Sequence, residues 1–153
     1  MTTPAKSPSA SAVEMNELVL PTHTNSLGTI FGGSVLAWID ICAAMAAQRH
    51  ARMQVVTASM EAVDFLAPIK LGHVVSLRAM VAHVGRTSMV VEVLVEAENP
   101  RTGFRVKAAK AHVTFVALDE DGRPEEVSQL LVETEEDRKR QDRARALRGR
   151  LQH

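Results

Sequence analysis

The spacing of hydrophobic and polar positions predicts a short strand followed by one long helix. Apolar residues alternate with polar ones from Val13 to Leu20 and stop at Pro21, as in a strand ended by a proline. Residues 35–52 are rich in Ala, Leu, Met and Ile, lack Gly and Pro, and follow Ser34, a favourable N-cap residue. They predict a helix of about five turns. Its apolar positions run almost all the way round, so most of its sides should be buried.

After the helix the pattern changes to a period of two, which predicts strands. Four such segments follow: Val55–Leu66, Val74–Val84, Thr87–Glu98 and Phe104–Leu118. The connections between them hold about two to six residues, which favours antiparallel neighbours because parallel crossovers need a dozen or more. One buried helix and one antiparallel sheet define the α+β class, and the simplest packing curls the sheet around the helix. Such a sheet has free edges, which the pairing of two subunits would protect.

The chain has 153 residues, a length that supports one domain, which we expect over residues 13–132. Residues 1–12 are biased to Pro, Ser and Ala and are expected to be a disordered lead-in. Residues 133–153 are charged and Arg-rich, and they are predicted to form a C-terminal helix or tail. Two roles stay open for this tail. It is either a solvated helix, or a segment that packs on the acidic body of a neighbouring subunit or lends charge near a ligand.

Composition and charge exclude several functions. The 18 bases balance the 18 acids, and only 3% of residues are aromatic, so the chain is neither an overall basic nucleic-acid binder nor a stacking platform for single strands. The balance hides an asymmetry. Residues 138–153 hold seven bases and one acid and carry +6, whereas residues 1–137 hold 11 bases and 17 acids and carry −6. The body is therefore acidic and the tail basic.

The single cysteine, Cys42, excludes an intrachain disulfide and a cysteine-based metal cage. The six histidines show no metal-ligand spacing, so no metal site is predicted. The first 13 residues lack the apolar segment of a secretory signal. The most apolar stretch, residues 35–47, is interrupted by Asp40 and is too short to span a bilayer. We therefore expect a cytoplasmic protein with no membrane association.

Asp40 is the most informative candidate for chemistry. Its helical neighbours at three and four positions are all apolar, so no local cation offsets its burial: Leu36, Ala37, Ala43 and Ala44. An ionised carboxylate on a dry helix face is costly. Either Asp40 faces a cleft or meets a distant partner, as a general base would, or it lies on the one exposed stripe of the helix.

Other candidates are weaker when taken alone. Glycines at 32 and 33 would leave bare N–H groups at the positive end of the helix, which suits an anion or a carbonyl oxygen, although a lone pair of glycines is more often an ordinary entry turn. Asn25 could hold a water or a substrate oxygen, or it could be a plain turn residue. The turn over residues 85–88 combines Gly, Arg, Thr and Ser and could grip a phosphate, with Lys107 and Lys110 adding positive charge. Cys42 is expected to be a buried, inert thiol.

Seven short motifs between residues 13 and 125 form a combined signature. They are Pro21–Asn25, Gly28–Gly33, Trp38–Asp40, Val56–Met60, Asp64–Ile69, Val84–Met89 and Val113–Asp119. Taken together they resemble the acyl-CoA thioesterases of the hotdog fold, in particular the bacterial YciA type and the cytosolic brain-type acyl-CoA hydrolases. The resemblance implies a curled antiparallel sheet around a long helix, in agreement with the α+β prediction.

The resemblance also implies an activity, the hydrolysis of acyl-CoA to a free acid and CoA, with no cofactor. It implies that Asp40 acts as general base or nucleophile, that Asn25 works with it across a dimer interface, and that Thr57 supports the attacking water. The backbone N–H of Gly33 would polarise the thioester carbonyl. The residues that would contact CoA are Gly85, Arg86, Thr87, Ser88 and Lys107. The family further suggests a homo-oligomer of dimers, assembled as a trimer of dimers.

Two alternatives compete with a thioesterase. Hotdog domains can also sense acyl-CoA without hydrolysing it, usually beside a DNA-binding domain. No helix-turn-helix pattern precedes this domain, and the presence of Asp40 and Asn25 favours an enzyme. A dehydratase acting on acyl-thioesters would want a catalytic histidine in place of the Asn and Asp, and none is suitably placed.

Overall fold

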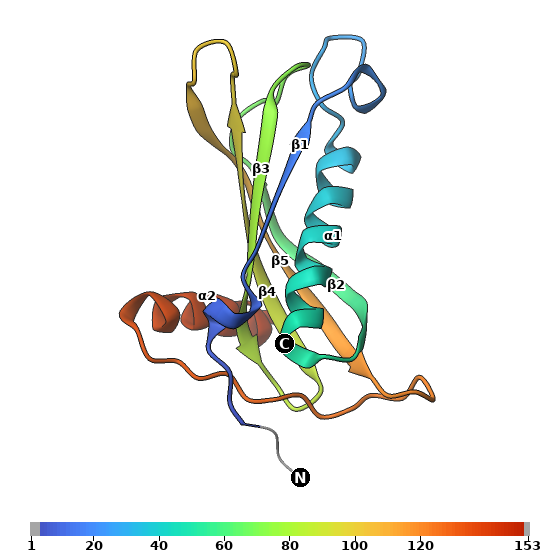
Figure 1. Ribbon diagram of the computed structural model, residues 1–153, viewed down its shortest axis with the longest axis vertical. Coiled ribbons are helices and arrows are strands. Elements are labelled where there is room, and N and C mark those ends of the chain that lie inside the picture. The colour runs from blue at the N-terminus through green and yellow to red at the C-terminus, as the bar shows by residue number, and fades with distance from the viewer. Residues whose placement is uncertain (1–3, 152–153) are drawn as a thin grey trace.

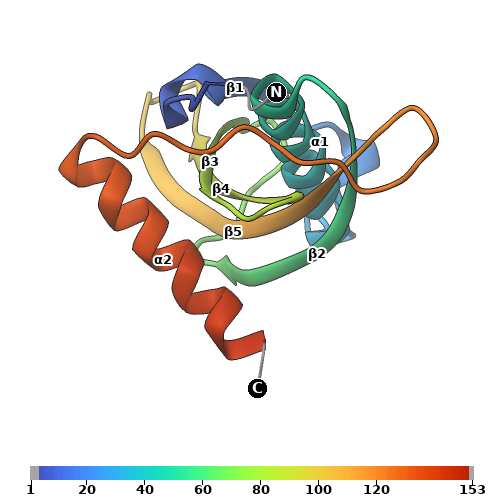
Figure 2. The ribbon, with the colours of Figure 1, turned by 90° about the horizontal axis from the view of Figure 1, so that it is seen from below.

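The computed structural model describes residues 4–151, with side chains described for residues 4–147. Its elements are η1 (Pro8–Ser11), β1 (Val13–Leu18), η2 (Pro21–His23), α1 (Gly32–Ala51), β2 (Gln54–Phe65), β3 (Val74–Val84), β4 (Ser88–Glu98), β5 (Arg105–Leu118) and α2 (Glu135–Leu151). The strands form one antiparallel sheet in the order β1-β3-β4-β5-β2. The sheet curls around α1, and α2 lies on its outer side (Figures 1 and 2). The predicted α+β architecture is confirmed.

The central helix begins earlier than its sequence predicts. Phe31 is the N-cap, without a side-chain capping bond, and its carbonyl accepts the N–H groups of Ser34 at 3.0 Å and Val35 at 3.4 Å. Ser34 therefore lies in the first turn, and its prediction as the N-cap is wrong because the helical hydrogen bonds already start at residue 31. At the other end, Arg52 adopts a left-handed conformation (φ 54°), and its N–H closes the last turn on Gln48.

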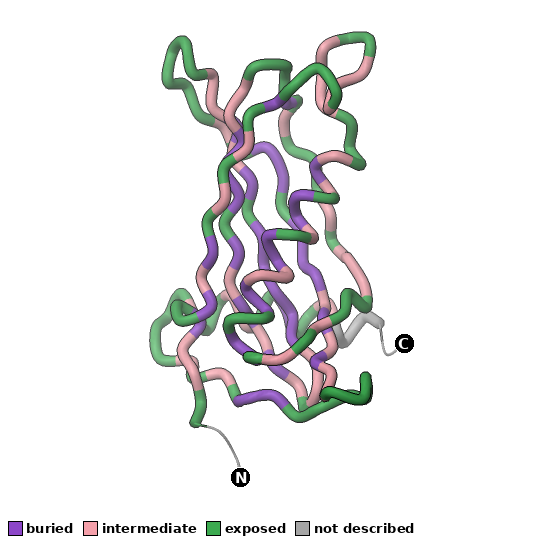
Figure 3. The backbone as a smooth tube through the Cα atoms, turned by 45° about the vertical axis from the view of Figure 1, so that its right-hand side comes forward, coloured by how far each residue is buried: buried purple, intermediate pink, exposed green. Residues whose placement is uncertain are grey.

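Most sides of α1 are buried as predicted, but one stripe stays open. Small residues on the inner face, such as Ala43, Ala46 and Ala47, are fully buried and let the helix approach the sheet closely. The sheet contributes to the same core the odd-numbered positions within residues 75–81 of β3, 89–97 of β4 and 109–117 of β5. On the opposite side of the helix, Ile41 is 53% exposed, and Gly33 and Ala37 are exposed as well. Buried residues thus run through β3, β4, β5 and one face of α1, with exposed loops at both ends (Figure 3).

Residues 4–12 pack against the body, which corrects the expectation of a disordered lead-in over residues 1–12. Lys6 pairs by its backbone with residues 129 and 131, at 2.9 and 2.8 Å, and its Nζ donates to the carbonyl of His50 at 2.8 Å. Ser11 is fully buried, and its Oγ accepts the N–H of Val81 at 2.9 Å. Polar side chains anchor this segment where apolar ones are scarce, so composition alone misleads. Residues 1–3 lie outside the described part of the chain.

The charged C-terminal helix is not merely solvated. α2 crosses the outer face of the sheet, where it contacts β3 and β4, and Ala144 is fully buried against Ala82 and Val90 (Figure 2). The prediction of a solvated helix therefore fails at the middle of α2, where Ala144 is buried and the half-exposed Arg143 binds a buried carboxylate of the sheet. That carboxylate belongs to Glu92, and α2 packs on its own protomer's sheet.

None of the helices described between residues 4 and 151 is long and apolar enough to cross a membrane.

A buried charge network fastens α2 to the sheet. Arg143 binds Glu92 through both carboxylate oxygens, with Nε to Oε2 at 2.9 Å and NH2 to Oε1 at 2.8 Å. His112 lies opposite Glu92 on β5, and its Nε2 is 3.1 Å from Oε2. Burial alone would raise the pKa of Glu92, but the hydrogen bonds and charges of His112 and Arg143 outweigh it and lower that pKa to about 2. The glutamate therefore stays ionised although it is only 6% exposed.

Candidate active site

The carboxylate of Asp40 is held by Thr57. Asp40 lies on the open stripe of α1 and is partly exposed, and the hydroxyl of Thr57 on β2 donates to its Oδ1 at 2.8 Å. A register shift follows Thr57 directly, and bulges of this kind often re-aim side chains beside active sites. No salt bridge joins Asp40 to a cation among residues 4–147. The carboxylate is thus oriented, accessible and free to take a proton or attack a carbon.

Asn25 organises its own loop. Its Oδ1 accepts the N–H groups of Leu27 at 2.9 Å and Thr29 at 3.2 Å, and its Nδ2 donates to the Thr29 hydroxyl at 2.9 Å. Gly28 completes the loop with φ 77°, a conformation that favours glycine. An amide has two Nδ2 protons, and only one has a partner within the described part of the chain. Asn25 therefore fulfils the structural role of a turn residue and keeps one donor for another group. Within the protomer, the described side-chain hydrogen bonds of Asn25 go to its own loop and not to Asp40.

Gly33 opens the N-terminal end of α1 to a ligand. The first N–H groups of a helix lack intrahelical carbonyl partners. No heavy atom of the described chain lies within 4 Å of where a Cβ on Gly33 would sit, so an oxygen can approach the backbone. Gly33 and Asp40 are seven residues apart, which separates them by about 10 Å along the helix axis. An oxyanion donor lies about 3 Å from the reacting oxygen, and a base acts directly or through one water. In one protomer the two groups are therefore too far apart along the helix to contact the same carbonyl directly.

The turn over residues 85–88 is closed by backbone hydrogen bonds and carries an exposed cation. The N–H of Gly85 donates to the carbonyl of Ser88 at 2.8 Å, and a Cβ on Gly85 would lie 2.8 Å from the Ser88 hydroxyl, so a larger residue there would force the Ser88 side chain to move. The carbonyl of Thr87 accepts the N–H of residue 117 at 2.9 Å. The side chain of Arg86 is 81% exposed and only 3.8 Å from Glu126, a surface pair of the kind that contributes little. Arg86 can therefore exchange its partner.

Lys107 lies far from this turn in the same protomer. Ser88 pairs with Val116 on β5, and Lys107 pairs with Glu96, so nine residues of strand separate the two ends of the sheet. At the usual rise per residue this is roughly 30 Å. The structure therefore does not group Lys107 with residues 85–88 within one chain.

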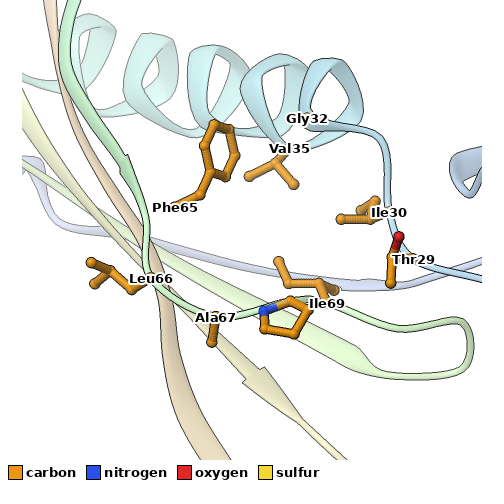
Figure 4. Close-up of a pocket in the computed structure, with 9 residues that line it drawn as sticks. Thr29, Ile30, Gly32, Val35, Phe65, Leu66, Ala67 and Ile69 are labelled. Carbon is orange, nitrogen blue, oxygen red and sulfur yellow. The ribbon is translucent and has the colours of Figure 1, made fainter.

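An apolar pocket that sequence reasoning did not locate lies beside the first turn of α1. Its volume is about 410 Å³. Its walls come from the segment before α1, from the helix itself and from the end of β2 with the residues that follow: Thr29, Ile30, Gly32, Val35, Phe65, Leu66, Ala67, Pro68 and Ile69 (Figure 4). The motif over residues 64–69 is the sequence feature that could have pointed to this pocket. Hydrophobic residues after a strand do not show by themselves that they line a pocket.

Cys42 is placed as expected for an inert thiol. It is fully buried, its Sγ lies 3.8 Å from the carbonyl oxygen of Leu77, and burial raises its pKa to about 11. A thiol with so high a pKa is a poor nucleophile near neutral pH.

Among the described residues, no group of three His, Cys, Asp or Glu side chains could hold a metal ion.

Comparison with known proteins identifies the family. The model of the Thioesterase superfamily matches residues 27–104. The acyl-CoA thioester hydrolase YkhA of Bacillus subtilis is 45% identical over 127 residues, which cover 83% of this chain and 74% of that protein. The chain belongs to the thioesterase superfamily, and its fold is the hotdog fold.

Solved structures agree in detail. An acyl-CoA hydrolase from Staphylococcus aureus, solved with butyryl-CoA, CoA and CoA disulfide, superposes with a TM-score of 0.91 at 40% identity over 97% of this chain and 91% of that one. A hexameric acyl-CoA thioesterase in its apo form gives a TM-score of 0.92 at 42% identity over 97% of this chain and 95% of that one. Structures of the staphylococcal hydrolase with alanine in place of an aspartate, a threonine or an asparagine also match, at 37–39% identity.

Proposed function

We propose that this thioesterase hydrolyses acyl-CoA to a free carboxylic acid and CoA, with Asp40 as general base or nucleophile. The observation that carries the proposal is the Asp40 carboxylate, oriented at 2.8 Å by Thr57 on the open stripe of a helix whose N-terminal end is bare. Solved relatives that bind butyryl-CoA and CoA support the substrate class. In the staphylococcal variants an aspartate, a threonine or an asparagine is replaced by alanine. These are the same residue types as Asp40, Thr57 and Asn25, to which we assign the catalytic roles in this chain.

The proposed chemistry follows from these groups. The N–H of Gly33 would bind the thioester oxygen and stabilise the negative charge that builds on it. As a base, Asp40 removes a proton from water while the hydroxide attacks the carbonyl carbon, the C–S bond breaks, and the CoA thiolate takes the proton. As a nucleophile, Asp40 attacks the carbonyl carbon, the C–S bond breaks, and the CoA thiolate leaves. Water then cleaves the resulting anhydride, which releases the acid, restores the Asp40 carboxylate and supplies the proton that the thiolate takes. Both routes need only acyl-CoA and water, so we propose no cofactor.

The site is proposed to be shared between two copies of the chain. About 10 Å of helix separates Gly33 from Asp40 in one protomer, so the oxyanion donor for Asp40 would come from a second protomer. Asn25 of that second protomer would donate its unused amide proton to the attacking water. β2 supports such pairing because it is an edge strand with one hydrogen-bonded neighbour. A dimer is then the minimal unit, and the similarity to a hexameric thioesterase supports a trimer of dimers.

CoA is proposed to bind at the turn formed by Gly85, Arg86, Thr87 and Ser88. A phosphate would compete with Glu126 for Arg86, and the weak surface pair makes that exchange easy. Lys107 lies roughly 30 Å from this turn along the strand, so it would reach CoA phosphates only from another protomer. The buried free thiol is compatible with a reducing cytoplasm, which we propose as the location.

Mixing two inactive variants tests the shared site. Thiol release is first measured with the wild-type protein on acyl-CoA substrates from acetyl to lauroyl. Asp40→Ala and Asn25→Ala proteins are then unfolded together and refolded. Half of the resulting dimers would contain both variants, and each would hold one intact site, so about a quarter of wild-type turnover should return.

The matched control mixes Asp40→Ala with Thr57→Val. These two side chains are bonded within one protomer, so no mixed dimer holds an intact site, and turnover should not rise above the average of the two variants refolded separately. Failure of the Asp40 and Asn25 mixture to recover activity would contradict a shared site. Wild-type protein that binds acyl-CoA without releasing thiol would instead favour a sensing module.

A further inference from the structure

The side chains that line the pocket beside α1 are mostly hydrocarbon. Val35 is fully buried and Ile69 is 2% exposed, so these two side chains form a fixed floor. Phe65 and Leu66, at 55% and 53% exposure, form an accessible rim. Thr29 provides the one polar side chain among the residues that line it, and none of them is charged. A pocket of this kind accepts aliphatic groups and does not compensate a buried charge.

The position of the pocket relates it to the reacting carbonyl. Gly32 lines the pocket and is followed directly by Gly33, whose N–H is the proposed oxyanion donor. A thioester oxygen at that N–H would place the acyl chain within reach of Val35 and Ile69. The phosphates of CoA cannot occupy this space, because no lining side chain would neutralise them.

Phe65 controls one side of the pocket. Its ring points from the end of β2 toward the first turn of α1 (Figure 4). The ring carbon Cζ lies 3.6 Å from where a Cβ on Gly32 would sit, which is ordinary van der Waals contact. The ring thus reaches across to the helix, and removing it would join the pocket to the solvent beyond.

We infer that this pocket receives the acyl group, that it selects unsubstituted aliphatic chains over chains ending in a carboxylate, and that Phe65 is a specificity-determining residue. The inference rests on the proposed thioesterase activity and deepens it. A terminal carboxylate would have to leave water for a pocket without a donor cation, and this penalty applies in the transition state as in the ground state. Chain length is limited at the ring of Phe65.

Butyryl-CoA and succinyl-CoA form a matched pair for the test, because both carry a four-carbon acyl chain and only succinyl ends in a carboxylate. Wild-type kcat/KM should favour butyryl-CoA by about 100-fold or more. Phe65→Arg places a cation at the rim and should lower the ratio of kcat/KM for butyryl-CoA to that for succinyl-CoA at least about tenfold.

A second substitution at the same residue tests chain length. Phe65→Ala should raise the ratio of octanoyl-CoA to butyryl-CoA turnover about tenfold. Phe104→Arg makes the same exchange at a 68% exposed residue outside the pocket and should leave both ratios unchanged.

Binding separates failure of this inference from failure of the proposed function. The Asp40→Asn protein should hold butyryl-CoA uncleaved, and calorimetry compares its affinity with that for CoA and succinyl-CoA. Tighter binding of butyryl-CoA that disappears in a Phe65→Arg background supports the pocket even if no turnover is seen. Equal affinities for butyryl-CoA and succinyl-CoA, or Phe65 variants that fold normally and leave both ratios unchanged, would overturn the inference while the thioesterase assignment stands.

Discussion

Replacing Asp40 by Asn is expected to lower kcat for acyl-CoA hydrolysis by about 10²- to 10⁴-fold, the usual range for loss of a general acid or base. The amide keeps the shape of the carboxylate, and its oxygen can still accept the hydrogen bond of Thr57. It can neither remove a proton from water nor attack a carbonyl carbon. KM for the substrate and the affinity for CoA should change little, because the proposed CoA contacts lie elsewhere. Stopped-flow thiol release with butyryl-CoA measures the effect.

The matched control for this prediction is Thr57→Val, which removes the 2.8 Å hydrogen bond and leaves the carboxylate. It should lower kcat by about tenfold, because orientation is lost but the reacting group remains. Asp40→Asn protein that retains wild-type kcat would exclude Asp40 from the chemistry. A larger loss in Thr57→Val than in Asp40→Asn would make the threonine the more important group.

Replacing Arg143 by Met is expected to lower the free energy of unfolding by about 2 kcal/mol, below the 3–5 kcal/mol typical when one partner of a fully buried pair is lost. The Glu92 carboxylate is 6% exposed and would lose its bidentate partner, whereas Arg143 itself is half-exposed and His112 remains in place. Urea unfolding of both proteins at one protein concentration measures the difference. Arg145→Met removes an exposed arginine from the same helix and should change stability little.

The same network predicts the direction of the acid response. The pKa of Glu92 is lowered from 4.5 to about 2 on folding, so the unfolded chain binds its proton more readily. The stabilisation from this carboxylate is therefore fully present above about pH 4.5 and is lost as the pH falls toward 2. The free energy of unfolding of the wild-type protein should decline as the pH falls across this window. The free energy of unfolding of the Arg143→Met protein should decline less over the same range. An identical acid response in both proteins would contradict the role assigned to the Arg143 contact.

The architecture could be predicted because its signals are local. Period-two segments and short turns define β2 to β5 to within two residues at each end, and one apolar run defines α1. Asp40 is the single charged residue within that run, and this is enough to make it a candidate catalytic residue. These features depend on neighbours a few residues apart, which a single sequence displays directly.

The remaining features depend on distant partners. Arg143 and Glu92 are 51 residues apart, so a charged helix that looks solvated hides a buried contact. Lys107 and the turn over residues 85–88 share a charge type but lie at opposite ends of the sheet. The amide of Asn25 is used mainly within its own loop, a competing role that residue type cannot exclude. Spacing along the chain contains none of this geometry.

The strand-like pairing of Lys6 with residues 129 and 131 has a consequence for biosynthesis. Its partners lie about 120 residues further along the chain, and its third contact is the carbonyl of His50 at the end of α1. While the chain emerges from a ribosome, the sheet and α1 can assemble and Ser11 can bind Val81, but the pairing of Lys6 has to wait for residue 131. Contacts of such long sequence separation form late. The backbone of Lys6 is therefore expected to stay unpaired, and open to proteases and chaperones, until residues 129–131 have been made.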